Sequence, residues 1–187
     1  VKMGWEIAGN RKVGVRLATE DIVGLESADG VERAKDKALG YLTHRPRSTA
    51  EVRQYLTERD FSEDVADEVI ARLERVGLVD DADFARFWIE NRVKFRPRGR
   101  RMLRYELYQK GIADEIIEDA LAGYDETAAI KRVAEKHARR LQHCDAETFR
   151  RRLYGRLARR GFDYALIREV IDSPEIPRPY SEQSEEV

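Results

Sequence analysis

The feature that most constrains the fold is a pattern that occurs three times, about fifty residues apart. In each copy a leucine is followed five residues later by Phe or Ile, as LTERDF at residues 56–61, LYQKGI at 107–112 and LARRGF at 157–162. Repeats of this length are typical of stacked structural units, each of which buries a face that it could not bury alone. We therefore expect function on an extended surface rather than in one catalytic cleft.

From about residue 32 the apolar residues recur with a helical period. The period and the turn residues predict an all-α fold, a tandem array of three three-helix repeats. The predicted helices lie near residues 31–44, 48–59 and 62–76 in the first unit, 81–95, 100–110 and 113–122 in the second, and 126–142, 146–160 and 163–172 in the third.

Helix-end signals agree with this division. Ser48 begins an S-x-x-E capping box, and Ser62 is an N-cap candidate for the next helix. The position after the middle helix of each unit is Asp60, Gly111 or Gly161. We expect a left-handed backbone there, because Gly adopts it freely and Asp tolerates it.

The two ends of the chain differ from the repeats. Val13, Val15 and Leu17 alternate with polar or small residues, which fits a small N-terminal β-hairpin, and Asp29-Gly30 punctuates the chain before the helices. Three prolines among acidic residues indicate a disordered tail. The expected segments are 1–30 for the N-terminal segment, 31–79, 80–123 and 124–172 for repeats 1 to 3, and 173–187 for the acidic tail.

Composition indicates a soluble, helix-rich protein, with 42% hydrophobic and 38% charged residues. No apolar run approaches the roughly 20 residues that cross a bilayer. The single cysteine, Cys144, excludes an internal disulfide and fits a reducing cytoplasm. The net charge of −1 conceals an asymmetry, because residues 128–172 carry 12 Lys and Arg against 6 Asp and Glu. Such a segment favours contact with a polyanion.

Three motifs, in the right order on the repeat, resemble those of the RecX regulatory proteins. RSTAEV at residues 47–52 resembles the opening of that family's first repeat. GLVDDADFA at 77–85, followed by Arg92, resembles its junction motif, and RPRG at 96–99 with LRYELYQKGI at 103–112 resembles its central-repeat signature. The resemblance covers about residues 34–172. The third repeat departs most, since it lacks the Pro-Gly pair.

RecX proteins are bacterial modulators of the RecA recombinase, built from tandem three-helix repeats. The resemblance therefore implies a regulator, mainly an inhibitor, that binds the RecA–single-stranded DNA filament. It would modulate ATP hydrolysis, strand exchange and the coprotease activity behind the SOS response to DNA damage. It further implies a cytoplasmic protein in homologous recombination and DNA repair, for which we expect a monomer.

Six positive charges straddle the predicted break between two helices of the second unit. Such a cluster can contact DNA phosphates or an acidic groove on a protein. Tyr105 and Tyr108 follow and either stack on exposed bases or pack between repeats. The residues that we assign to contact with the RecA filament or its DNA are Lys94, Arg96, Arg98, Arg100, Arg101 and Arg104.

A second basic cluster lies in the third unit. Arg152, Arg156 and Arg159 recur at helical spacing and should share one face. The alternative is a solubilising face with weak local ion pairs, but few carboxylates lie within reach on that helix. The cluster comprises Arg139, Arg140, Arg150, Arg151, Arg152, Arg156, Arg159 and Arg160, of which we assign Arg139, Arg140, Arg152, Arg156 and Arg159 to filament or DNA contact.

The sequence indicates neither a catalytic site nor a metal site. His137, His143 and Cys144 are one ligand short of the usual structural zinc site, and their spacing matches no zinc motif. The phosphate-binding, nucleophile-elbow and zinc-protease motifs are absent from the sequence. We expect no enzyme activity, no cofactor and no membrane association.

Two other functions remain open. A helix, a short turn and a second helix superficially resemble a helix-turn-helix DNA-binding module, although acidic helices near 62–76 and 113–122 oppose insertion into a groove. Weak binding of single-stranded DNA through the arginine clusters is compatible with either function. The third candidate is a scaffold with a different protein partner.

Overall fold

The computed structural model describes residues 19–180, with side chains from residue 29 onward. Within this range the chain forms nine α-helices and no β-strand, so the all-α prediction is confirmed. The helices are α1 (Thr19–Leu42), α2 (Thr49–Thr57), α3 (Glu63–Arg75), α4 (Asp81–Phe95), α5 (Arg100–Tyr108), α6 (Asp114–Ala122), α7 (Glu126–Ala138), α8 (Ala146–Ala158) and α9 (Tyr164–Asp172).

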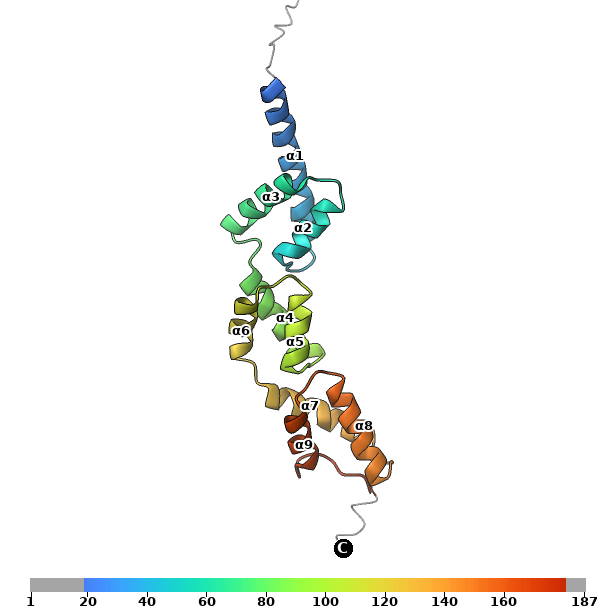
Figure 1. The fold of residues 1–187 in the computed structure, drawn as a ribbon. Helices are drawn as coiled ribbons and strands as arrows, with labels where there is room; N and C mark the ends of the chain where they lie inside the picture. Colours follow the sequence, from blue (N-terminus) through green and yellow to red (C-terminus); the bar gives the residue numbers. More distant parts are fainter. Residues whose placement is uncertain (1–18, 181–187) are drawn as a thin grey trace, which may run out of the picture.

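The helices form three units of three, stacked in chain order into an elongated molecule (Figure 1). Extensive helix–helix packing occurs only within a unit: among α1, α2 and α3, among α4, α5 and α6, and among α7, α8 and α9. Neighbouring units therefore meet through turns and helix ends rather than through long helix faces. The third-unit helices α7 and α8 end slightly before their predicted ends at residues 142 and 160.

Each middle helix ends in the left-handed turn that the repeat predicts. The backbone angle φ is 63° at Asp60, 75° at Gly111 and 82° at Gly161. Ser48 and Ser62 cap α2 and α3 as expected, with their side chains accepting from the amides of residues 51 and 65. The three units are therefore built on one local plan.

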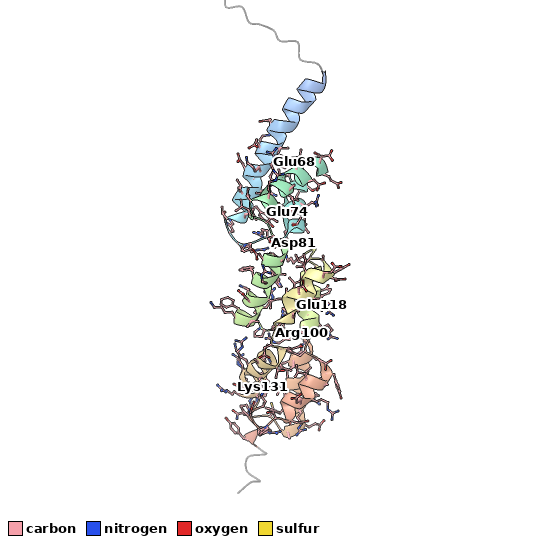
Figure 2. The ribbon with its side chains drawn as sticks, turned by 90° about the vertical axis from the view of Figure 1, so that its left-hand side faces the viewer. Glu68, Glu74, Asp81, Arg100, Glu118 and Lys131 are labelled. Atoms are coloured by element: carbon pink, nitrogen blue, oxygen red, sulfur yellow. The ribbon has the colours of Figure 1, made fainter. Side chains whose placement is uncertain are left out.

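The two joints between units also repeat a common bonding pattern. The amide of the first residue of each middle helix donates to a carboxylate at the start of the next unit: Thr49 to Asp81 at 2.8 Å, and Arg100 to Glu126 at 2.9 Å. Figure 2 shows Asp81 at the first joint and Arg100 at the second. Each carboxylate thus satisfies a helix N-terminus of the preceding unit.

A second bond at each joint involves the residue just before the middle helix. The Ser48 hydroxyl donates to the carbonyl oxygen of Lys110 at 2.7 Å, and the Gly99 amide donates to the carbonyl oxygen of Arg160 at 2.9 Å. These carbonyls immediately precede the left-handed glycines Gly111 and Gly161. The left-handed turn of one unit therefore packs against the N-terminus of the middle helix in the preceding unit.

The apolar cores show that the two joints differ in character. Buried residues of the first unit, such as Val52, Leu56 and Ile70, form one cluster. Those of the second and third units form a single continuous cluster that includes Leu107 and Leu157. The first joint therefore rests mainly on polar bonds, whereas a shared core also holds the second joint together.

The N-terminal expectation was wrong where the structure tests it. Helix α1 begins at Thr19, so residues 19–30 are helical rather than part of a hairpin; Val13, Val15 and Leu17 lie outside the described residues. Asp29-Gly30 lies within α1, because a glycine inside a helix costs only about 1 kcal/mol. Asp29 also pairs with Arg33 one turn later, at 3.3 Å.

The expectation of a disordered tail from residue 173 was wrong for its first part. Ile176 is buried against the third unit, with 2% of its surface exposed. The Tyr180 amide donates to the carbonyl oxygen of Gln142 at 2.9 Å. One apolar anchor and this backbone bond hold the chain against the third unit as far as residue 180, despite its prolines and acidic residues.

We expect Ser48→Ala to lower the free energy of unfolding by about 2 kcal/mol, because it removes an N-cap and leaves a buried carbonyl at Lys110 without this donor. Ser62→Ala is the matched control, since the Ser62 side chain caps α3 and has no hydrogen bond to another unit among the described residues; a loss of about 1 kcal/mol is expected there. Urea denaturation measures both. Equal losses would show that the Ser48 bond to the second unit contributes nothing.

Candidate functional site

The structure divides the first predicted basic cluster into different roles. Arg100 holds the second joint: its guanidinium donates to the carbonyl oxygens of Leu121 and Tyr124, both at 2.8 Å. Arg104 pairs with Glu118 across α5 and α6. Its charge is partly offset, and the donors of Arg100 are already used within the fold.

The remaining members of that cluster differ in exposure. Lys94 and Arg101 are exposed, and the Lys94 amine lies 5.4 Å from the centre of the Phe95 ring. Arg98 is half-buried and its Nε lies 3.5 Å from a carboxylate oxygen of Glu106. Arg96 is exposed and has no carboxylate partner among the described residues. Of the six residues, Arg96 and Arg98 are those that the fold brings to the second cluster.

Glu106 organises the polar side of the second unit. Its carboxylate accepts from the Trp88 indole at 2.9 Å and from Arg92 at 2.6 Å, and it also faces Arg98. The Arg92 guanidinium stacks over the Trp88 ring at 4.2 Å. Because one carboxylate serves two guanidinium groups, this network keeps a net positive charge beside the second joint.

A basic recess lies where the two predicted clusters meet. It has a volume of about 350 Å³, and its lining consists of five arginines and one histidine from three places in the chain. Arg96 and Arg98 come from the connection between α4 and α5, His137 comes from α7, and the rest come from the end of α8. The lining residues are Arg96, Arg98, His137, Arg156, Arg159 and Arg160.

A groove continues from the recess along α8. Its lining is Arg151, Arg152, Gly155, Arg156 and Arg159, and its volume is also about 350 Å³. Arg156 and Arg159 belong to both hollows, so the two form one surface, which we call the α8 basic surface. Among the residues that the structure describes, no carboxylate lines either hollow. The expected common face of Arg152, Arg156 and Arg159 is therefore present.

The hollows at the two joints differ in the charge of the side chains that line them. The hollow at the first joint is lined by acidic, amide and aromatic side chains as well as Lys110 and Arg59. There the Glu51 carboxylate pairs with Lys110 at 2.5 Å and with Arg45 at 2.9 Å. The same architectural position thus carries balanced charge at one joint and only positive charge at the other.

Uncompensated charge in the recess perturbs its titratable groups. Burial, together with the positive charges of Arg156 and Arg160, lowers the pKa of His137 to about 4. Burial, followed by the charge of Arg98, also lowers the pKa of Arg160. A site in which arginines disfavour each other's charge is a site where a bound anion gains strong stabilisation.

Sequence reasoning missed three residues of this surface. From the sequence, His137 is considered only as a metal ligand, and Arg151 and Arg160 belong to the second cluster without being assigned to partner contact. A signal for Arg160 did exist, because it precedes the left-handed Gly161 as Lys110 precedes Gly111. For His137 no sequence signal existed, since only the packing of α7 against α8 brings its ring to 3.4 Å from the Arg156 guanidinium.

Other predicted site residues lie elsewhere. Arg139 and Arg140 are exposed just after α7 and line neither hollow, and Arg139 approaches Glu135 at 3.8 Å. Tyr105 and Tyr108 are exposed by 60% and 63%. The interpretation that these two tyrosines pack between repeats is therefore wrong, and stacking on bases stays a prediction.

The described part of the chain has neither a membrane-spanning helix nor a cluster of metal-ligating side chains. None of its helices is long and apolar enough to cross a membrane. No three or more His, Cys, Asp and Glu side chains there are grouped so as to hold a metal ion. Cys144 is buried and lies 3.5 Å from the Arg152 guanidinium instead.

Comparison with known families gives matches along the whole repeat region. Three family models match in order: the first three-helix domain of RecX over residues 34–73, the second over 80–121 and the third over 124–171. Each matched stretch falls within one of the three helical units. The models together cover more than half of the chain.

Curated relatives agree. The chain is 39% identical over 146 residues to the regulatory protein RecX of Prosthecochloris aestuarii, a match that covers 78% of this chain and 96% of the relative. It is 40% identical over 148 residues to the regulatory protein RecX of Mycolicibacterium smegmatis, covering 75% of this chain and 78% of that protein.

Solved structures share the fold. The crystal structure of RecX from Lactobacillus salivarius superposes with a TM-score of 0.69 at 29% identity, over 77% of this chain and 96% of that one. A crystal structure of a regulatory protein RecX gives a TM-score of 0.76 at 24% identity, over 86% and 82% of the two chains. With the ordered family models and the sequence identities, these similarities show that the chain belongs to the RecX family of regulatory proteins.

Proposed function

We propose that this chain regulates RecA by binding the RecA–single-stranded DNA filament, and that it mainly inhibits ATP hydrolysis, strand exchange and SOS coprotease activity. The observation that carries the proposal is the α8 basic surface, a carboxylate-free run of arginines in a chain of the RecX family. A nucleoprotein filament is a polyanion, and such a surface gives it affinity and a fast approach.

The shape of the molecule supports action by occupancy rather than by chemistry. Three units are joined end to end, so one cytoplasmic monomer presents contacts over a length greater than that of a single unit (Figure 1). We propose that the chain bridges neighbouring filament subunits and hinders the changes that accompany nucleotide hydrolysis. The polar first joint allows the first unit to adjust to the partner while the second and third units stay together.

The charge layout disfavours reading of duplex DNA by a helix-turn-helix. The third helices of the first two units, α3 and α6, begin with Glu63 and Asp64 and with Asp114 and Glu115. A recognition helix places its N-terminal residues against the major groove. Carboxylates at those positions repel the phosphates, so we favour contact through α8.

The test is single-strand-dependent ATP hydrolysis by RecA from the same source, with the full chain titrated in. We expect inhibition. Inhibition at substoichiometric ratios would favour capping of filament ends, whereas near-stoichiometric inhibition would favour occupancy along the filament. Unchanged hydrolysis at saturating, correctly folded protein would overturn the proposed function.

A further inference from the structure

Within the part of the chain that the structure describes, Arg98 is the one arginine of the α8 basic surface with a carboxylate, that of Glu106, within ion-pair distance. Among the described residues, no carboxylate lies within ion-pair distance of Arg96, Arg156, Arg159 or Arg160. Elsewhere in the molecule arginines are generally paired, as Arg92 is with Glu106 and Arg150 with Asp172. The surface thus holds several guanidinium groups together without the counter-charges that the rest of the fold provides.

The lining of the recess distinguishes between kinds of anionic partner. Protein interfaces generally depend on buried aromatic or aliphatic anchors, yet the recess is lined by arginine and histidine alone. Interfaces with nucleic acid are more polar and far more positively charged. The composition of the recess therefore favours phosphates over the side chains of an acidic protein.

The spacing of the arginines suits a polymer with regularly spaced charges. Arg152, Arg156 and Arg159 follow one another on α8 with rises of about 6 Å and 4.5 Å, and Arg156 and Arg159 belong to both the groove and the recess. Gly155 lines the groove between them, and a Cβ there would lie 3.3 Å from the Arg159 guanidinium. The absence of a side chain at Gly155 therefore lets the Arg159 guanidinium lie close against α8 at the groove.

His137 is enclosed by positive groups from every element around it. Only 8% of its surface is exposed, and its Nδ1 lies 3.4 Å from Arg156. The groups that face it are Lys136 and Arg140 from its own helix and the turn that follows, Arg156 and Arg160 from α8 and its end, and Arg96 and Arg98 across the recess. In the free protein, burial of the ring and then these positive charges lower the pKa of His137 and keep the imidazole neutral.

We propose that the recess and groove bind consecutive backbone phosphates of nucleic acid, and that His137 takes up a proton when the recess is filled. Phosphates neutralise the guanidinium field that disfavours the imidazolium, so occupancy and protonation stabilise each other. The inference deepens the proposed function by naming the polyanion that α8 contacts. Its test uses no RecA, so its failure and the failure of the proposed function are distinguishable.

The sign of the pH dependence follows from linkage. The pKa of His137 lies at about 4 in the free protein, and a bound phosphate raises it. The complex then binds more protons than the free components, so affinity increases as pH falls. A return of the bound-state pKa to the ordinary histidine value of about 6.5 predicts about tenfold tighter binding at pH 5.5 than at pH 7.5.

The experiment measures binding of the full chain to a fluorescent 20-residue oligothymidylate at constant ionic strength, at pH 5.5, 6.5 and 7.5. We expect about tenfold tightening towards low pH for the wild type and for His143→Gln, whose histidine is exposed. His137→Gln should bind normally at pH 7.5 and lose the tightening. An NMR titration of the wild-type imidazole, with and without oligothymidylate, reads the same proton uptake without any substitution.

Arginine variants test the phosphate contact itself. Arg156→Ala with Arg159→Ala should weaken oligothymidylate binding at least tenfold, because these residues serve both hollows. The matched control is Arg150→Ala with Arg168→Ala, which removes two charges from the third unit outside both hollows. Circular dichroism verifies helicity in each variant, and we expect the control to bind like the wild type.

Three results would overturn the inference. Equal binding by the two double variants would remove the phosphate site from α8. A tightening at low pH that persists in His137→Gln, or an unchanged His137 titration, would exclude the proton uptake. Polyglutamate that displaces oligothymidylate at equal charge concentration, and depends on the same arginines, would assign the surface to an acidic protein segment.

Discussion

Reversal of two charges on α8, Arg156→Glu with Arg159→Glu, is expected to abolish inhibition of RecA ATP hydrolysis at concentrations where the wild type inhibits fully. These residues lie in both hollows of the α8 basic surface, so the change places carboxylates wherever an anion would bind. We expect a loss of about 3 kcal/mol or more in binding, or more than about a hundredfold in the concentration for half-inhibition. The titration of single-strand-dependent ATP hydrolysis measures it.

The fold should tolerate this change, because neither arginine pairs with a carboxylate among the described residues. The matched control reverses the charges of Arg150 and Arg168 by substitution with Glu. These two residues belong to the same unit but line neither hollow. This control should inhibit within about threefold of the wild type. Full inhibition by the folded Arg156 and Arg159 variant would exclude α8 as the partner surface.

The second large effect concerns the joint that forms the recess. Gly161→Ala should lower the free energy of unfolding by about 3 kcal/mol, because strain and a steric clash add. Gly161 has φ of 82°, and an added Cβ would lie 2.5 Å from the Met102 Cβ and 2.8 Å from the Met102 amide nitrogen. Relief of the clash requires the second and third units to separate.

Gly77→Ala provides the control for backbone strain alone. Gly77 has φ of 70°, but an added Cβ would meet nothing within 4 Å. We expect Gly77→Ala to lower the free energy of unfolding by about 1 kcal/mol. Urea denaturation compares the two variants, and equal losses would show that close approach of the units at Gly161 does not stabilise the protein.

In the first unit the left-handed position is occupied by Asp60 rather than by glycine, and the packing around the three turns explains why a side chain is tolerated there. Asp60 adopts φ of 63°, yet among the described residues its turn forms no joint with another unit. The turns at Gly111 and Gly161 each form such a joint, where an added Cβ would clash with Ala50 or Met102. Glycine therefore occupies this position in the two units whose left-handed turn forms a joint with the preceding unit, and Asp occupies it in the first unit.

The local structure was predictable because local signals determine it. Helical periodicity, the Ser48 and Ser62 caps and the left-handed positions are properties of short segments, and the structure confirms them. Helix ends were less certain, and α1 continues through Asp29-Gly30 because one glycine does not outweigh the favourable packing of Val31 and Ala34 on the following turns.

The composition of the site was only partly predictable. Periodicity placed Arg152, Arg156 and Arg159 on one face, but it could not show that the joint brings Arg96 to them. Nor could it show that the Arg100 guanidinium donates to the carbonyl oxygens of Leu121 and Tyr124 at the second joint. These facts depend on contacts between residues from 21 to 63 positions apart, which the spacing of charges along the chain does not encode.

The structure distinguishes arginines that stabilise the fold from arginines available to bind a partner. This distinction changes which variants best test partner binding. A combined substitution of Arg98, Arg101 and Arg104, which the sequence suggests, also removes ion pairs to Glu106 and Glu118. Arg96 and Arg159 have no such partner among the described residues. Variants at these two positions therefore report on binding with less effect on folding.

The measurement that tests the central claim most directly is the affinity of the labelled chain for preformed RecA–single-stranded DNA filaments at several salt concentrations. We predict steep weakening with salt for the wild type. For Arg156→Ala with Arg159→Ala we predict weaker binding and a log–log slope smaller by about 1.4, since each single-strand phosphate contact contributes about 0.7. Equal affinity and equal slope for the two proteins would contradict the assignment of the α8 basic surface to the filament.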